Sequence, residues 1–129
     1  MALQSASRIA SDLRVIVGPE HARSDDASLQ TYGVDALGKG HPPDIVVLPA
    51  STEEVAAIAR LCNAERVPLV VRGAGTGFTG GAVPTCGGVL LSMERLNRIL
   101  EIDGLNLLAV VEPNVINADL QRGDPLPAR

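Results

Sequence analysis

A glycine-rich run that follows an apolar segment constrains this chain more than any other feature. Residues 72–81 read Arg-Gly-Ala-Gly-Thr-Gly-Phe-Thr-Gly-Gly, so half of the positions lack a Cβ. Glycine backbones adopt positive φ and approach a ligand closely. Successive exposed N–H groups form a concave nest that favours an anion, and Thr76 and Thr79 add hydroxyl donors. The run predicts a pyrophosphate-binding loop rather than a merely flexible connection.

The segment before the loop predicts two parallel strands joined by a helix. Residues 45–48 are a short apolar run before Pro49, and residues 69–71 are a second one. Between them, Ser51 and Glu54 have the spacing of a capping box. Apolar side chains then recur at i, i+3, i+4 and i+7 of a helix: Val55, Ile58, Ala59 and Cys62. A strand, a helix and a strand in close succession favour a βαβ unit with parallel strands.

The flanking segments are mixed in type. Residues 3–17 predict a helix with one apolar stripe, formed by Leu3, Ile9, Leu13 and Ile16 and ended by Gly18-Pro19. A polar, irregular lead-in follows up to residue 44, with a short helix near residues 26–32. After the loop we expect a strand at 88–92 and a turn at 93–97. Strands at 99–102 and 107–112 follow, joined around Asp103-Gly104, which is a hairpin signal. A helix is expected to begin within 116–121. The predicted fold class is α+β, with an α/β-like βαβ start.

The loop formally satisfies the fingerprint of NAD-binding Rossmann domains. Gly75, Gly77 and Gly80 have the GxGxxG spacing, and Glu101 lies about twenty residues further on, where that fingerprint has its acid. A Rossmann loop must open a helix, however, and residues 82–88, Ala-Val-Pro-Thr-Cys-Gly-Gly, do not favour a helix start. No Gly-Lys-Ser/Thr of a Walker loop is present either. Phosphate binding is therefore expected from loop amides, and a Rossmann NAD enzyme is disfavoured.

Composition excludes several other classes of function. Lys and Arg number 11 and are scattered, the net charge is −4, and the chain has one Phe, one Tyr and no Trp, which disfavours nucleic-acid binding. No apolar run has the length of a membrane span. Cys62 and Cys86 lack CxxC spacing and only two histidines are present, so we predict no metal site and a reduced, cytoplasmic setting.

Several short segments, in order along the chain, resemble one known family. They are Tyr32-x-x-Asp35, Pro49-x-Ser51-x-Glu53-Glu54-Val55, Arg72-Gly-Ala-Gly-Thr-Gly, Gly80-Gly81, Leu96-Asn-Arg-Ile-Leu100 and Glu112-Pro113. These segments look like the FAD-linked oxidases of the p-cresol methylhydroxylase and vanillyl-alcohol oxidase type. The nearest branch is that of the glycolate oxidase FAD subunit and the bacterial D-lactate dehydrogenases. The resemblance extends over about residues 29–121 and departs at Asn114, where the family commonly has glycine.

The resemblance implies a site for FAD. Residues 73–77 would hold the pyrophosphate, Gly80 and Gly81 would continue the wall, and Pro49 would lie near the adenine. The cofactor-binding residues predicted in this way are Pro49, Arg72, Gly73, Ala74, Gly75, Thr76, Gly77, Phe78, Thr79, Gly80 and Gly81, with no catalytic residue and no metal ligand. Some relatives bond the flavin covalently to a histidine at the place of Thr76, so we expect non-covalent FAD here. For Arg72, a fixed positive charge and a brace for the loop are both open.

The resemblance also implies a reaction and a division into domains. The family branch oxidises a 2-hydroxy acid to a 2-oxo acid and passes electrons to an acceptor, sometimes a partner electron-transfer subunit. Residues 1–43 would be a lead-in, residues 44–121 the first lobe of an incomplete FAD domain of p-cresol methylhydroxylase type, and residues 122–129 a tail outside the family. The abrupt change at the tail suggests a frameshift, a premature stop or a gene-model boundary.

By the same resemblance, we expect the second FAD lobe and the substrate-binding cap of that family to be absent from this chain. We therefore expect no turnover of a 2-hydroxy acid by the chain alone. The alternative is a module that binds a nucleotide or a protein and has no catalytic role. Flavin content and acceptor reduction would separate the two.

Overall fold

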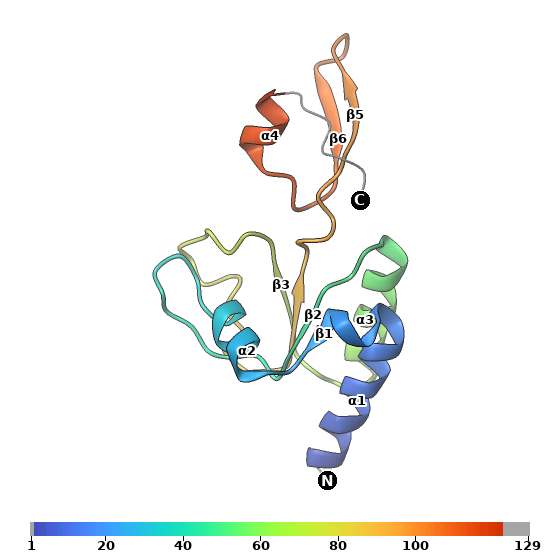
Figure 1. Ribbon diagram of the computed structural model, residues 1–129, viewed down its shortest axis with the longest axis vertical. Coiled ribbons are helices and arrows are strands. Elements are labelled where there is room, and N and C mark those ends of the chain that lie inside the picture. The colour runs from blue at the N-terminus through green and yellow to red at the C-terminus, as the bar shows by residue number, and fades with distance from the viewer. Residues whose placement is uncertain (1, 123–129) are drawn as a thin grey trace.

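The computed structural model describes residues 2–122, and their side chains from Arg8 onward. The elements in chain order are α1 (Ala2–Val17), a 3-10 turn (Pro19–His21), β1 (Ala22–Arg23), α2 (Asp26–Tyr32), β2 (Ile45–Val47), α3 (Thr52–Ala64), β3 (Leu69–Arg72), β4 (Val89–Ser92), β5 (Ile99–Asp103), β6 (Leu108–Val111) and α4 (Asn117–Arg122) (Figure 1). The mixed α+β class predicted from sequence is confirmed. The tail at 123–129 and the side chain of Leu3 lie outside what the structure describes.

The main sheet has the order β1-β2-β4-β3. Strands β2 and β3 both pair in parallel with β4, through Val46 opposite Leu90 and Val70 opposite Leu90. The predicted parallel direction of β2 and β3 is therefore confirmed, but the two strands are not neighbours. Strand β4 is buried at every position, whereas β3 is partly exposed, so the most apolar strand takes the centre and β3 takes the edge. The antiparallel edge strand β1, which has two residues, was not predicted.

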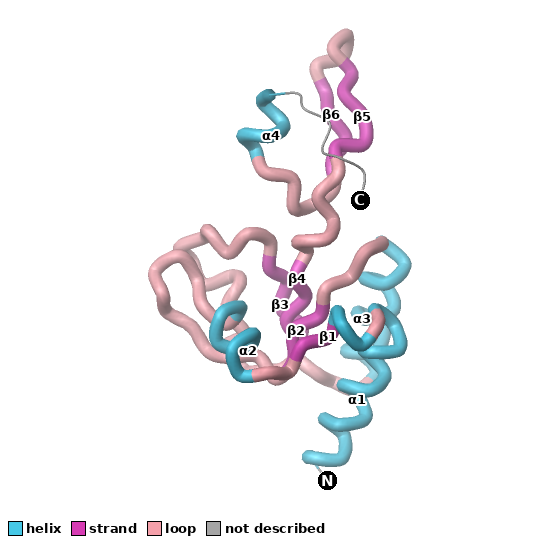
Figure 2. Tube along the Cα trace, viewed as in Figure 1, coloured by secondary structure: helices cyan, strands magenta, loops and turns pink. Residues whose placement is uncertain are grey.

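Helices cover both faces of the sheet, as Figure 2 shows. Helices α1 and α3 pack on one face through Leu13, Ile58 and Cys62, against a cluster that includes Leu91. The other face carries a smaller cluster of Val46, Leu48 and Leu90, with Leu29 and Tyr32 of α2 packed against it.

The predicted apolar stripes of α1 and α3 are correct with two changes. Ala59 is exposed, while Leu61 packs partly buried against the core. In α1, Val17 is buried and Ile16 is only partly buried.

Two polar contacts fix the ends of the parallel strands. Ser51 caps α3 by accepting a hydrogen bond from the Glu54 N–H (3.2 Å), and the Glu54 carboxylate accepts from the Ala50 N–H (2.7 Å). The predicted capping box is thus confirmed, with the reciprocal bond made to the preceding residue. Asp44 accepts from the Gly88 N–H (2.7 Å) and its own N–H donates to the Gly88 carbonyl (2.8 Å). This pair holds the returning chain where β4 begins.

Strands β5 and β6 form an antiparallel hairpin that projects away from the main sheet (Figure 1). The predicted hairpin is confirmed, with a turn at residues 104–107. The Asp103 carboxylate accepts hydrogen bonds from the N–H groups of Leu105 (2.9 Å) and Asn106 (3.0 Å), which closes the turn. Along β5, Leu100 and Ile102 remain exposed.

The base of the hairpin is closed by an ion pair. The Glu112 carboxylate accepts from the Arg98 main-chain N–H (2.8 Å), Nε (3.0 Å) and Nη2 (2.7 Å). The Glu112 side chain is 10% exposed and the Arg98 side chain is 66% exposed. These bonds give Glu112 the structural role of a brace for the neighbouring turn. The hydrogen bonds from Arg98 lower the pKa of Glu112 below its ordinary value of 4.5.

Acid should therefore loosen the hairpin. A carboxylate with a lowered pKa in the folded chain adds stability above its ordinary pKa, and that stability is lost as pH falls through the lowered value. We expect the amide NMR signals of β5 and β6 to shift toward random-coil positions as pH falls below 4.5. Glu112→Gln should show the loosened hairpin at neutral pH already. The control is Glu101→Gln, because the Glu101 side chain makes no hydrogen bond within residues 2–122. A wild-type hairpin that stays unchanged down to about pH 1, where the carboxylates are protonated, would contradict the prediction.

Candidate functional site

The carboxyl ends of the three parallel strands meet at one edge of the sheet. There β2 leads to Pro49, β3 leads to Gly73 and β4 leads to Glu94. In open sheets with parallel strands, ligands bind at this edge because loops from several strands converge there. The glycine-rich loop begins at this edge, so the fold places it where a binding site is expected.

The loop itself leaves its main-chain donors exposed. Residues 73–88 contain no helix, as the sequence predicted. Among the hydrogen bonds of residues 2–122, none is donated by a main-chain N–H of residues 74–79. Thr76 and Thr79 are exposed, and so is Phe78, whose side chain is 69% exposed. A run of consecutive N–H groups without protein partners is what an anion-binding nest requires.

Two glycines of the loop have no role in the packing of the protein. A Cβ added to Gly77 or Gly81 would meet no protein atom within 4 Å, and neither residue has positive φ. Protein sterics and backbone conformation therefore do not explain why these positions lack side chains. Glycine at these positions leaves the backbone open to close approach by a ligand.

Arg72 turns away from the open side of the loop. Its Nη1 donates to the Val34 carbonyl, and its guanidinium lies 6.0 Å from the centre of the Tyr32 ring. A Cβ on Gly75 would be 2.2 Å from the Arg72 Cζ, so the guanidinium lies directly against the backbone of Gly75. Of the two roles left open by the sequence, this geometry favours a brace.

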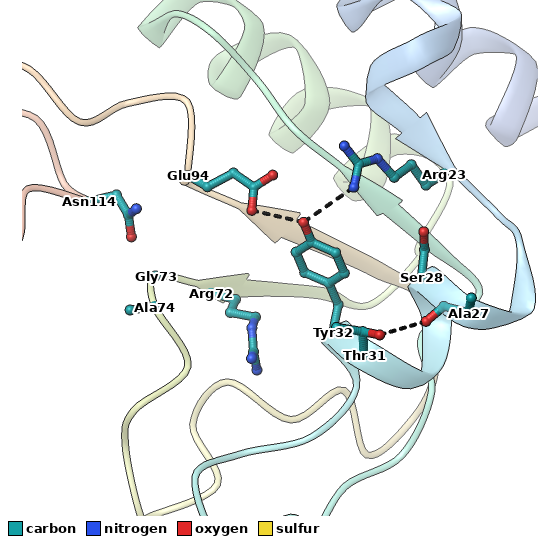
Figure 3. A pocket seen from close by; sticks show the side chains of 10 residues that line it. All are labelled: Arg23, Ala27, Ser28, Thr31, Tyr32, Arg72, Gly73, Ala74, Glu94 and Asn114. Carbon is teal, nitrogen blue, oxygen red and sulfur yellow. Dashed lines mark hydrogen bonds between the residues drawn. The ribbon is translucent and has the colours of Figure 1, made fainter. Parts of the chain in front are cut away.

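A pocket of about 540 Å³ lies beside the start of the loop. Figure 3 shows Tyr32 at its centre, with Arg72 on one side of the ring and the Arg23 and Glu94 side chains near the hydroxyl. The Tyr32 hydroxyl donates to the Glu94 carboxylate (2.8 Å) and accepts from the Arg23 guanidinium (3.5 Å). Burial raises the pKa of Tyr32, and the adjacent Glu94 carboxylate adds to the rise. The phenol therefore stays protonated and acts as a donor.

Sequence reasoning assigned a site role to three of the ten residues that line the pocket: Arg72, Gly73 and Ala74. Tyr32 and Asn114 were named only in the family resemblance, and the other five belong to no motif: Arg23, Ala27, Ser28, Thr31 and Glu94. A Cβ on Gly73 would be 3.4 Å from the Asn114 Oδ1, so the Asn114 side chain lies close to the start of the loop. The one signal that pointed to Glu94 is its place directly after a buried strand, at the carboxyl edge.

The predicted site residues fall into two groups. The side chain of Pro49 is fully buried, at the end of β2. The other ten, residues 72–81, form one continuous segment at the end of β3. The structure thus brings the first three loop residues, 72–74, together with Tyr32, Glu94 and Asn114. The binding roles of Pro49 and of the individual loop residues stay predictions.

Comparison with known proteins identifies the class. The family model described as "FAD binding domain" matches residues 43–123. The chain belongs to this family of FAD-binding domains, and FAD is its cofactor. The residues fit that cofactor, since the loop offers free main-chain donors and two glycines that no protein contact explains.

The relatives confirm the branch. The chain is 42% identical over 108 residues to the glycolate oxidase subunit GlcD of Bacillus subtilis (strain 168), which covers 83% of this chain and 23% of that protein. It is 38% identical over 107 residues to a D-lactate dehydrogenase of Anaerostipes hadrus, covering 83% of this chain and 22% of that protein. The resemblance to FAD-linked oxidoreductases of this branch is therefore confirmed.

The fold also matches a solved structure. The crystal structure of p-cresol methylhydroxylase with substrate bound superposes with a TM-score of 0.81 and 23% identity, over 93% of this chain and 24% of that chain. At this identity the match shows the fold alone, and it confirms the predicted FAD-domain type. The chain spans about a quarter of the length of the relatives it matches. The boundaries predicted for the lobe and the tail stay predictions.

Two features are absent from residues 2–122. The structure there has no helix that is both long and apolar enough to cross a membrane. It also has no group of three or more His, Cys, Asp or Glu side chains that could hold a metal ion.

Proposed function

We propose that this chain binds FAD non-covalently as part of an oxidoreductase that oxidises a 2-hydroxy acid of the glycolate or D-lactate type to a 2-oxo acid. The observation that supports it best is the loop at the carboxyl edge, whose residues 74–79 offer main-chain donors without partners among the described residues. Glycolate oxidase and D-lactate dehydrogenase among the relatives favour this substrate class.

The proposed binding mode assigns the diphosphate of FAD to the loop amides. No helix begins within residues 82–88, directly after the loop, so the partial positive charge comes from individual N–H groups rather than from a helix dipole. The Thr76 and Thr79 hydroxyls would add donors. The flavin, when bound, supplies the redox chemistry by accepting a hydride equivalent, and the protein orients it.

The loop offers no side chain for a covalent bond to the flavin of the kind made by histidine. Thr76 stands at the position where some relatives carry that histidine, and no histidine occurs after His41. Acid or urea should therefore release all FAD from the protein. Yellow colour that stays with the precipitated protein would contradict non-covalent binding.

A titration of the purified 129-residue chain tests the proposal. FAD binding is followed by flavin fluorescence, with ADP, FMN and NAD as competitors. If the loop recognises the diphosphate, ADP should compete with FAD and FMN should compete poorly, because FMN lacks the diphosphate. A chain that binds neither FAD nor ADP would overturn the proposal.

Oxidation of a 2-hydroxy acid separates the proposed oxidoreductase from a nucleotide-binding module without a catalytic role. We propose that substrate oxidation requires parts of a longer protein, because the chain spans about a quarter of its relatives. FAD binding without dye reduction by glycolate or D-lactate is therefore expected from the chain. The same result in the complete protein would favour a nucleotide-binding module without a catalytic role. An electron-transfer subunit and a cytoplasmic setting stay predictions.

A further inference from the structure

We propose that Tyr32 and Val34, which precede the matched family region, hold Arg72 against Gly75 and so fix the shape of the FAD-binding loop. In this view Arg72 and Tyr32 are positioning residues. The contribution of this contact to FAD affinity rests on the proposed function. The effect of the contact on the order of the loop does not rest on that function, so loop order and FAD affinity are measured in separate tests.

Three contacts converge on one planar group. The Arg72 guanidinium donates to the Val34 carbonyl, lies 6.0 Å from the centre of the Tyr32 ring and occupies the space where a Gly75 side chain would be. A guanidinium at this distance from an aromatic ring gains cation–π attraction. Gly75 thus lacks a side chain for a reason internal to the protein, unlike Gly77 and Gly81.

The two groups that hold Arg72 are themselves fixed. Val34 forms an antiparallel bridge with Gly40, and the His41 N–H donates to the Gly33 carbonyl (3.1 Å), which closes the segment on itself. A Cβ on Gly40 would be 1.9 Å from the Gly33 carbonyl oxygen, so the two chains are in close contact. The carbonyl that receives Arg72 therefore has a defined position.

Tyr32 connects Arg72, and through it the loop at Gly75, to the main sheet. Its ring packs against the cluster of Val46, Leu48 and Leu90, and its hydroxyl donates to Glu94, which is 62 residues away at the end of β4. Through this side chain the loop is connected to the buried centre of the sheet. The family match begins at residue 43, so this connection lies outside the matched region.

The brace matters because the loop is costly to order. A glycine-rich segment has many conformations, and fixing each residue in one of them costs conformational entropy. The N–H groups of residues 74–79 donate no hydrogen bond within residues 2–122, so the loop receives little order from its own main chain. A contact that orders Gly75 before FAD binds removes part of that cost from the binding step.

The first test measures loop order in the chain without FAD, by 15N relaxation of Gly73, Gly75 and Gly77. With the brace intact, order parameters near about 0.85 are expected, and Arg72→Met should lower them below about 0.6. Arg95→Met is the matched control, because Arg95 also donates to a main-chain carbonyl, that of Leu48 (2.9 Å), away from the loop. Unchanged loop order in Arg72→Met would overturn the proposal.

Two substitutions of Tyr32 cover the case in which Arg72→Met does not fold. Tyr32→Phe keeps the ring beside Arg72 and should keep the loop ordered. Tyr32→Leu removes the ring and should disorder it. Equal order in the two variants would overturn the role of the ring.

The second test measures FAD affinity. Arg72→Met and Tyr32→Leu should each weaken FAD binding about tenfold, and Tyr32→Phe should stay within about threefold of the wild type. The dependence of affinity on salt should be the same in Tyr32→Leu as in the wild type, because a brace removes no charge from the diphosphate. Wild-type affinity in Tyr32→Leu would overturn the brace. If the wild-type chain binds no FAD, the proposed function fails while the relaxation test still decides the brace.

Discussion

Gly75→Ala should weaken FAD binding about thirtyfold to a hundredfold while the sheet stays folded. Gly75 has φ of +72°, where an alanine costs about 1–2 kcal/mol. The new Cβ would also be 2.2 Å from the Arg72 Cζ, so the guanidinium must leave its place against the loop. Both effects act on the exposed loop and leave the core untouched. Fluorescence titration with FAD measures the loss of affinity, and far-UV circular dichroism shows whether the sheet stays folded.

Gly104→Ala is the matched control. Gly104 lies in the turn of the hairpin, has no positive φ, and a Cβ there would meet no atom within 4 Å. This variant should bind FAD as the wild type does. If Gly75→Ala kept wild-type affinity as well, the conformation of the loop at Gly75 would have no part in binding.

Leu91→Ala should lower the free energy of unfolding by about 2–5 kcal/mol. Leu91 is fully buried in the central strand β4, within the larger hydrophobic cluster. Truncation removes apolar contacts and leaves a cavity that a rigid sheet closes only in part. For a domain whose total stability is about 5–15 kcal/mol, this loss is a large fraction. Urea denaturation followed by circular dichroism measures it.

Leu105→Ala provides the comparison. Leu105 is 95% exposed at the tip of the hairpin, so its truncation should change stability by less than about 0.5 kcal/mol. A Leu91→Ala cost below about 1 kcal/mol would contradict the position of β4 at the centre of the core.

Local patterns in the sequence predicted the elements well. The apolar run at 45–48, the capping box at Ser51 and Glu54 and the polar turn after Asp103 each depend on neighbours within a few residues. Their prediction succeeds because propensity, capping and turn chemistry are local. The loop at 72–81 was recognised for the same reason.

The pairing of strands and the surroundings of the loop were harder to predict. Hydrophobic periodicity shows which side of a strand is buried but not which strand lies next to it, so the insertion of β4 between β2 and β3 was missed. The contact between Tyr32 and Glu94 joins residues 62 positions apart. No spacing rule encodes such a contact, nor the contact between the Arg72 guanidinium and the Val34 carbonyl, 38 residues apart.

The order β2-β4-β3 also has a consequence for folding during synthesis. Strands β2 and β3 share no ladder. Among the described strands, β4 is the one partner of β3 and the one parallel partner of β2, whose other neighbour is the antiparallel β1. A nascent chain that ends before Val89 therefore has its helix α3 and two strands but no parallel pair. Non-local pairing of this kind forms slowly, because the chain loses the entropy of loop closure before any strand contact stabilises it. The sheet is completed only when Ser92 has left the ribosome and the glycine-rich segment has already folded back.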